Sequence, residues 1–163
     1  MHMKKLIVDF MYLDLRTCER CMATDDNLDQ ALSFMADPLR ILGYKVERNK
    51  IEIKTRELAE QHRLISSPTI RVNGIDICGE VKECFCKDCK DLCDDDVDCR
   101  VFVYDGKEFD QPPVPMIIDG ILKVLYGGHH AVKEDYKLPD NLDKFFRSKR
   151  AGPDDITVIK RCC

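Results

Sequence analysis

Cysteine is the residue type through which this chain is equipped to do chemistry, and ten cysteines occur among its 163 residues. Two of them, Cys18 and Cys21, are separated by two residues in the segment TCERC. This spacing suits dithiol–disulfide exchange or half of a metal site, because both reactions use the thiolate form of the sulfur. The sequence therefore predicts a reactive pair here, with a zinc half-site or two inert core cysteines as the alternatives.

Six further cysteines are crowded into residues 78–99, CGEVKECFCKDCKDLCDDDVDC. They are Cys78, Cys84, Cys86, Cys89, Cys93 and Cys99. Zinc takes four thiolates in a tetrahedron, and Cys86 with Cys89 has the spacing of a zinc knuckle. We expect this insert to bind a metal ion, zinc first. The alternatives are an iron–sulfur cluster, or two or three disulfides with no metal.

A third group of thiols is the pair Cys162 and Cys163, which follows Lys160 and Arg161. Adjacent Cα atoms are about 3.8 Å apart, less than the roughly 4.4–6.8 Å found in disulfides. The pair is therefore expected to stay a dithiol or to bond other sulfurs, and two thiolates suit a soft metal ion. It is similar to the C-terminal vicinal cysteines of mercuric reductases. The alternative is a tail whose two thiols have no role.

The elements that must position Cys18 and Cys21 follow from the apolar pattern. Residues 4–13 are a dense apolar run typical of a buried strand, and residues 14–21 are a polar turn that carries both cysteines. Residues 22–42 repeat apolar side chains at three- and four-residue spacing, which predicts a helix ended by Gly43. A strand over 44–53 and a short helix over 55–63 follow.

The second half of the pattern begins with SSPTIRVNG at 66–74, a strand entered through Pro68 and closed by an Asn73–Gly74 hairpin turn. Beyond the insert come a strand over 100–104, a turn at Asp105–Gly106 and helices over 114–126 and 139–149. We divide the chain into a domain of residues 1–128, which includes the insert 78–99, and a C-terminal extension, 129–163.

The segments TCERC and SPTIRVNG, in this order of elements, resemble the thioredoxin and glutaredoxin families over roughly residues 4–126, apart from the insert. The resemblance implies an α/β thioredoxin-like fold, a central mixed sheet flanked by helices. The insert would lie before the last core strand and a C-terminal tail would follow. It also implies that Pro68 is a cis-proline that presents backbone to an extended substrate. Cys18 would be the solvent-facing nucleophile and Cys21 the resolving thiol.

The insert together with VYDGKEFDQPPVPMIIDGIL looks like an uncharacterised family of prokaryotic thioredoxin-like proteins, described only as a domain of unknown function. That closer resemblance implies no activity. The residues between the paired cysteines are Glu-Arg, where thioredoxin has Gly-Pro, and the chain has no Trp. Reduction potential and choice of partner therefore do not carry over from thioredoxin.

Two functions are predicted from these thiols. The first is a thiol–disulfide oxidoreductase acting on a protein or small-molecule disulfide; the second is binding or transfer of a soft metal or metalloid, namely mercury, arsenic, copper or zinc. A scaffold with a zinc-stabilised insert is a third reading. The net charge of −4 argues against nucleic-acid binding, and no apolar run reaches membrane-spanning length. No secretory signal is visible, so we expect a cytosolic protein.

Overall fold

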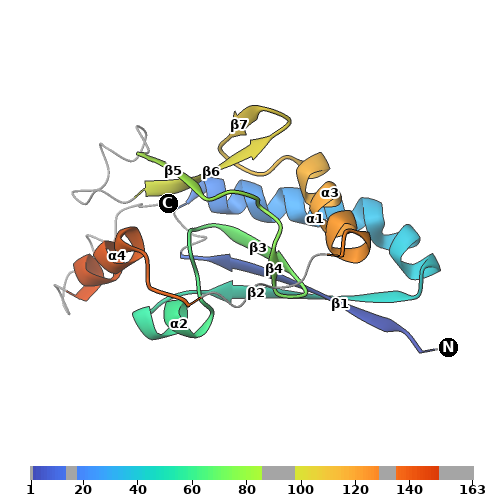
Figure 1. The fold of residues 1–163 in the computed structure, drawn as a ribbon, viewed down its shortest axis with the longest axis horizontal. Helices are drawn as coiled ribbons and strands as arrows, with labels where there is room; N and C mark the ends of the chain where they lie inside the picture. The colour runs from blue at the N-terminus through green and yellow to red at the C-terminus, as the bar shows by residue number, and fades with distance from the viewer. Residues whose placement is uncertain (1, 14–17, 86–97, 129–134, 151–163) are drawn as a thin grey trace.

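The computed structural model describes residues 2–13, 18–85, 98–128 and 135–150, and its strands and helices form a mixed α/β fold (Figure 1). The elements are β1 (Lys4–Tyr12), α1 (Glu19–Ile41), β2 (Tyr44–Glu52), α2 (Arg56–Gln61), β3 (Thr69–Val72), β4 (Ile75–Asp76), β5 (Lys82–Phe85), β6 (Asp98–Tyr104), β7 (Lys107–Phe109), α3 (Val114–Tyr126) and α4 (Asp140–Arg150).

A four-stranded mixed sheet is built in the order β2–β1–β3–β4. Strand β2 runs parallel to β1, whereas β3 pairs antiparallel to β1, with Phe10 opposite Ile70. Helices α1 and α3 lie together over one face of this sheet (Figure 1). This arrangement is compatible with the expected thioredoxin-like fold.

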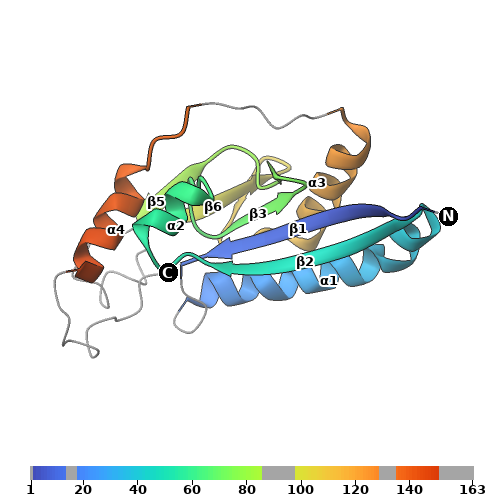
Figure 2. The ribbon, with the colours of Figure 1, turned by 90° about the horizontal axis from the view of Figure 1, so that it is seen from below.

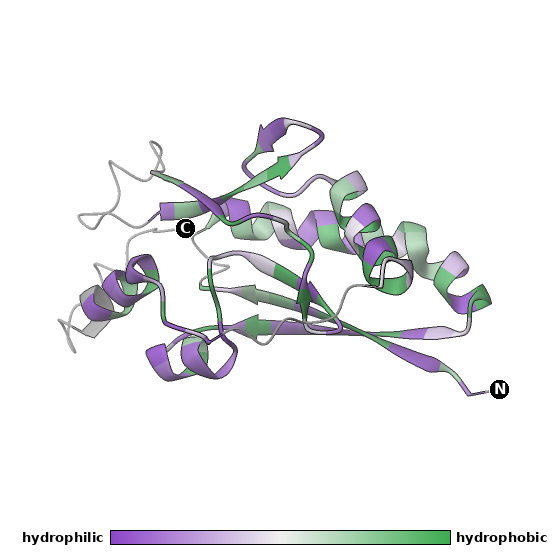
Figure 3. Cartoon of the chain, viewed as in Figure 1, coloured by the Kyte–Doolittle hydropathy of each residue, from purple (hydrophilic) through white to green (hydrophobic). Residues whose placement is uncertain are grey.

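Strand β1 alternates between buried and more exposed residues from Leu6 to Asp9 and is buried on both faces from Phe10 to Tyr12. Leu6, Val8 and Phe10 belong to the main apolar cluster, together with residues of α1 and α3. Met11 and Leu13 point the other way, into a second cluster with α2 and α4. In Figure 3 most of α2 and α4 is coloured hydrophilic, with hydrophobic residues interspersed, and Figure 2 shows these two helices beside each other at one end of the molecule.

Helix α1 begins one turn earlier than the sequence pattern predicts. Its first residue is Glu19 rather than Met22, so Cys21 lies inside the helix and not in a turn. The start of the helix contains the charged Glu19 and Arg20 and buries Cys21 and Thr24, and the first buried leucine of the apolar repeat is Leu28. The pattern therefore missed the first turn. At the other end Gly43, with φ of 79°, follows the helix as expected.

Both predicted hairpin turns are confirmed. Asn73 and Gly74, which join β3 to β4, have φ values of 49° and 81°. Asp105 and Gly106, which join β6 to β7, have φ values of 50° and 72°. Positive φ at both central residues is the type I′ geometry that matches the twist of antiparallel strands.

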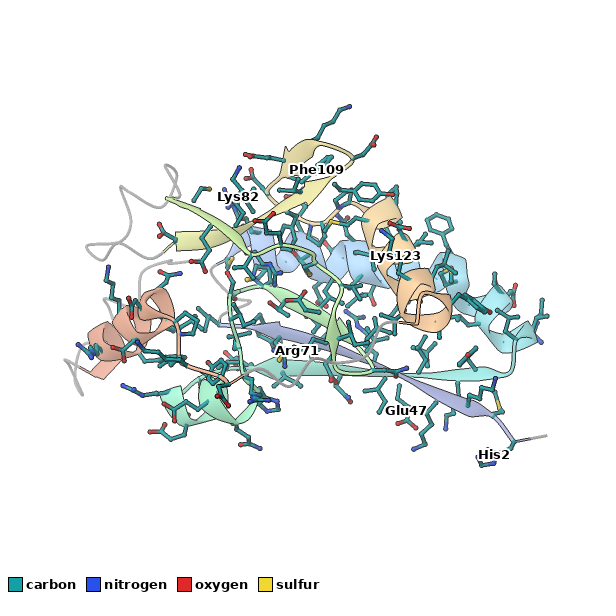
Figure 4. The ribbon with its side chains drawn as sticks, viewed as in Figure 1. His2, Glu47, Arg71, Lys82, Phe109 and Lys123 are labelled. Atoms are coloured by element: carbon teal, nitrogen blue, oxygen red, sulfur yellow. The ribbon has the colours of Figure 1, made fainter. Side chains whose placement is uncertain are left out.

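The expectation for the insert was wrong at its two ends. Residues 82–85 form β5 and pair antiparallel with β6, which begins at Asp98. Strand β6 therefore belongs to a second sheet, β5–β6–β7, and the insert follows the last strand of the first sheet instead of preceding it. Lys82 and Phe109, both labelled in Figure 4, come from the two outer strands of this second sheet.

Helix α3 approaches the chain that leaves β4 very closely. A Cβ atom placed on Gly120 would lie 2.7 Å from the Cβ of Ile77, closer than two such carbons can pack. Glycine at this helical position therefore sets the distance between α3 and the segment that leads into Cys78.

The structure contains no candidate for a transmembrane helix among the residues it describes.

Candidate functional site: cysteines at a helix start and across a hairpin

Cys18 is the N-cap residue of α1 and has an extended backbone, with φ of −103° and ψ of 103°. Its Sγ accepts a hydrogen bond of 3.2 Å from the backbone N–H of Cys21, and its carbonyl oxygen accepts a bond of 3.0 Å from Met22 N–H. The sulfur thus takes the place that a hydroxyl or carboxylate oxygen holds at most helix starts. A backbone donor and the positive end of the helix dipole both favour a thiolate there.

Both sulfurs of this pair are buried. Cys18 and Cys21 each have 0% of their surface exposed and belong to the main apolar cluster. The expectation that Cys18 faces solvent is therefore wrong for this structure, because the residue sits in the core at the base of α1. Cys18 therefore lies at a helix start, which favours a thiolate, but its sulfur is not accessible to solvent.

The arginine between the two cysteines is engaged in an ion pair. Arg20, between the two cysteines, places its guanidinium 2.8 Å from the carboxylate of Asp110. Only 14% of the Arg20 side chain is exposed, against 66% of the Asp110 side chain. An ion pair reduces the positive field that Arg20 exerts on a nearby thiolate. The helix end is therefore the main activating feature.

Pro68 follows a cis peptide bond from Ser67, as the resemblance to thioredoxin and glutaredoxin implies, and directly precedes β3. Ser67 is fixed on both sides. Its hydroxyl accepts a bond of 3.2 Å from the N–H of Leu13, at the end of β1. Its carbonyl oxygen accepts a bond of 3.2 Å from the N–H of Arg100 in β6. The backbone acceptor before Pro68, which was expected to meet a substrate, is thus bonded to the protein's own second sheet.

Arg100 connects the two sheets and was missed by the sequence analysis. Its side chain is 0% exposed, and its guanidinium donates to Thr69 Oγ1 at 2.7 Å and to Asp76 at 2.8 Å. A third bond of 3.1 Å reaches the carbonyl of Gly79. A buried arginine needs this number of acceptors to offset its desolvation. The sequence RVFVY at 100–104 contains no feature that predicts burial of its arginine.

Cys78 behaves as a core residue in this structure. Its Sγ lies 3.4 Å from the N–H of Ile70, and burial raises its pKa to about 12. At neutral pH it is therefore a thiol and not a thiolate, and only the thiolate attacks disulfides or binds zinc. A ligand role for Cys78 stays a prediction and would require removal of this proton.

Cys84 and Cys99 lie directly opposite one another in the ladder between β5 and β6. Cys99 is buried and Cys84 is half-buried. Two cysteines that are distant in the sequence thus face each other across one hairpin, a juxtaposition that their spacing in the sequence does not reveal.

The predicted metal site is not assembled within the described part of the chain. Among those residues no three or more His, Cys, Asp or Glu side chains gather closely enough to hold an ion. Cys86, Cys89, Cys93, Cys162 and Cys163 lie outside the described residues. Zinc, an iron–sulfur cluster and soft-metal transfer therefore all stay predictions.

Comparison with known proteins gives a family but no activity. No curated protein and no solved structure matches the chain. Residues 6–121 match the family model described as Domain of unknown function (DUF2703). This match spans β1 through most of α3, including the Cys18–Cys21 pair, Pro68 and the whole insert. The chain therefore belongs to the DUF2703 family.

Proposed function

We propose that this protein is a thioredoxin-like thiol–disulfide oxidoreductase that acts through Cys18 and Cys21. The hydrogen bond from Cys21 N–H to Cys18 Sγ at the start of α1 carries the proposal. Of the described cysteines, Cys18 alone holds a helix N-cap position, where the backbone favours negative charge on the sulfur. The order β2–β1–β3–β4 and the place of Ser67–Pro68 before β3 support the thioredoxin-like assignment.

The reaction is an exchange of one disulfide for another. The Cys18 thiolate attacks one sulfur of the substrate disulfide, and the first substrate thiol leaves. Cys21 then attacks the Cys18 sulfur of the mixed disulfide and releases the second substrate thiol. The two protein thiols are oxidised to one disulfide, and the substrate disulfide is reduced to two thiols that carry the two protons.

Burial limits how a substrate reaches this pair. Since Cys18 and Cys21 are fully enclosed, attack requires a state in which the packing around the base of α1 opens. If that state is sparsely populated, the observed rate falls by the same fraction. We therefore expect slow reduction of protein disulfides and faster reduction of small ones, which need a smaller opening.

The test is oxidation of Cys18 and Cys21 in the reduced full-length chain by a small aromatic disulfide, followed by thiol blocking and peptide mapping, since other thiols of the chain also react with this reagent. We expect Cys18→Ser to lower the rate at which Cys21 becomes unblockable by about 10³-fold or more, because serine oxygen does not replace a thiolate nucleophile. Cys21→Ser should instead trap the mixed disulfide on Cys18. The matched control is Met22→Ser, which removes an exposed sulfur from the same helix turn. Unchanged activity of Cys18→Ser would refute the proposal.

A further inference from the structure

The positions of Cys84 and Cys99 in the second sheet are those of two residues that a disulfide can join. They are paired directly in the antiparallel β5–β6 ladder. Residues paired in this way have Cα atoms about 4.5 or 5.5 Å apart, depending on the type of pair. Both values fall inside the range of roughly 4.4–6.8 Å seen for disulfides. Directly opposed side chains also lie on the same face of the ladder.

The neighbouring pair shows which face this is. Glu83 is opposite Arg100, and both side chains reach toward the first sheet, Glu83 to Ser66 at 2.6 Å and Arg100 to Thr69. Because successive residues of a strand alternate between faces, Cys84 and Cys99 lie on the other face. Cys84 is half-buried there, so one of the two thiols is within reach of solvent.

Tertiary contacts fix the register of this pair. Glu83, next to Cys84, accepts hydrogen bonds from Ser66 and Asn141. Asp98, which precedes Cys99, exchanges backbone hydrogen bonds of 2.9 and 2.8 Å with the Asn141 amide. Arg100, which follows Cys99, is bonded through its N–H to Ser67. The side chain before Cys84 and the backbone on both sides of Cys99 are thus held, and a slip in register would break these bonds.

We propose that Cys84 and Cys99 form a second redox couple, a disulfide across the β5–β6 hairpin that forms and breaks independently of Cys18 and Cys21. This goes beyond the proposed function, which does not use either residue. It also distinguishes two members of the cysteine-rich insert from the remaining four, because only this pair is brought together by a described ladder.

The reactant is a small-molecule disulfide. The half-buried Cys84, as thiolate, attacks one of its sulfurs, the S–S bond of the reactant breaks, and one small thiol leaves. Cys99 then attacks the Cys84 sulfur, which forms the hairpin disulfide and releases the second small thiol. Two protein thiols are oxidised and one small disulfide is reduced, and excess small thiol reverses both steps.

The experiment is thiol mapping of the metal-free full-length chain in glutathione buffers that run from reducing to oxidising. Thiols are blocked after acid quenching, and the chain is cut with trypsin. Cys84 is then on peptide 83–87 and Cys99 on peptide 91–100, each with a second cysteine that fragment ions must distinguish. We expect peptides 83–87 and 91–100 to become linked through Cys84 and Cys99 in oxidising buffer and to separate in reducing buffer.

The variants test the pairing. Cys99→Ser should abolish the link through Cys84, and the matched variant Cys86→Ser should retain it. Links that instead join either residue to Cys86, Cys89 or Cys93 would overturn the proposal. The proposal would also be overturned if the thiols of Cys84 and Cys99 could still be blocked in the most oxidising buffer. A third contradicting result would be zinc that is present in the purified wild type and lost in Cys84→Ser. Cys18 and Cys21 are on separate peptides, 17–20 and 21–40, so their state is scored independently in the same digest.

Discussion

The start of α1 and the β5–β6 hairpin each hold two cysteines, but they provide different conditions for sulfur chemistry. At the helix start the two thiols are one turn apart, and Cys18 Sγ receives a backbone hydrogen bond from Cys21. In the hairpin, Cys84 and Cys99 come from strands that are paired over a long connection. At the helix start, the backbone and the helix dipole favour a thiolate, but both cysteines are buried. In the hairpin, Cys84 is half-buried, but both cysteines lie within strands and not at a helix end.

The difference teaches that local and long-range structure contribute separately to a thiol site. A helix N-terminus activates a sulfur through groups within four residues of it. A strand pair determines which sulfurs meet, through register that distant contacts maintain. In this chain the hairpin is joined to the end of β1 through Ser67, whose carbonyl accepts from the Arg100 N–H of β6 and whose hydroxyl accepts from the Leu13 N–H.

The strongest way to break the comparison is Arg100→Met, which removes the buried side chain that bonds to Thr69 and Asp76 of the first sheet and keeps the backbone N–H that bonds to Ser67. The substitution leaves the Asp76 carboxylate and Thr69 without their buried donor. Removing one partner of a buried ion pair typically costs about 3–5 kcal/mol. Since the Asp76 side chain is 22% exposed, we expect a loss near the lower end in urea unfolding. The exposed Lys82–Glu108 pair is the control, and Lys82→Ala should leave stability unchanged within error.

If Arg100→Met unfolds at the wild-type urea concentration, the two sheets are not held together by this side chain. The bonds of Ser67 and Ser66 to Arg100 N–H and Glu83 would then be what joins the hairpin to the first sheet.

The next effect concerns the hairpin alone. A disulfide between Cys84 and Cys99 would close a loop of about 15 residues, which is expected to add about 3 kcal/mol to the free energy of unfolding. Urea unfolding of wild type in oxidising and reducing buffer should differ by about this amount, and Cys99→Ser should remove the difference. A difference that persists in Cys99→Ser would assign the stabilisation to another cysteine pair.

Cys78 provides a third case for the comparison, because its thiol is buried like that of Cys18 but does not lie at the start of a helix. Because its pKa is raised from 9.0 to about 12, the folded chain keeps a proton that the unfolded chain loses above pH 9. Stability should therefore fall between pH 9 and 12, with a slope approaching about 1.4 kcal/mol per pH unit. Cys78→Ala should flatten this slope in urea titrations.

Tyr136 also contributes to the pH dependence of stability in this range and must be separated from Cys78. Burial raises its pKa from 10.0 to about 12 as well, so Tyr136→Phe should flatten the curve only above pH 10. Equal slopes in wild type and Cys78→Ala between pH 9 and 10 would show that Cys78 is not enclosed in solution.

The smallest effect tests the end of the strand pair where β5 finishes and β6 begins. Asn141→Ala removes the amide that bonds the backbone of Asp98 on both its N–H and its carbonyl. We expect a loss of about 1 kcal/mol in the free energy of unfolding. The yield of the Cys84–Cys99 link should also fall, since the register of β6 loses one of its supports. If the free energy of unfolding falls but the yield of the Cys84–Cys99 link does not change, the Asn141 amide stabilises the fold without maintaining the register of β6.

The elements that the sequence predicts well are those whose pattern is local. Strand β1, helix α3 and the Asn73–Gly74 turn each depend on side chains within a few residues, and all three are confirmed. The start of α1 was missed because its cap is a cysteine, which is not among the usual N-cap residues. The pattern therefore located the reactive pair but not the element that contains Cys21.

The second sheet could not be predicted for a different reason. Residues 82–85, Lys-Glu-Cys-Phe, have no apolar alternation, and their pairing with β6 depends on contacts with Ser66 and Asn141 far along the chain. The burial of Arg100 likewise depends on Asp76 and Gly79, which meet it only after folding. A single sequence contains no period that encodes such contacts.

Gly120 sets a limit on how this molecule can vary. Its missing side chain is the gap into which Ile77 fits, so the spacing of α3 and the chain behind β4 is fixed at a single glycine. Even one added methyl group would act as a spacer and tilt or lift the helix, at a cost of about 1–3 kcal/mol. The lifted helix would loosen the lining beside Cys78. Tolerance at position 120 therefore measures how tightly the protein must enclose the thiol of Cys78.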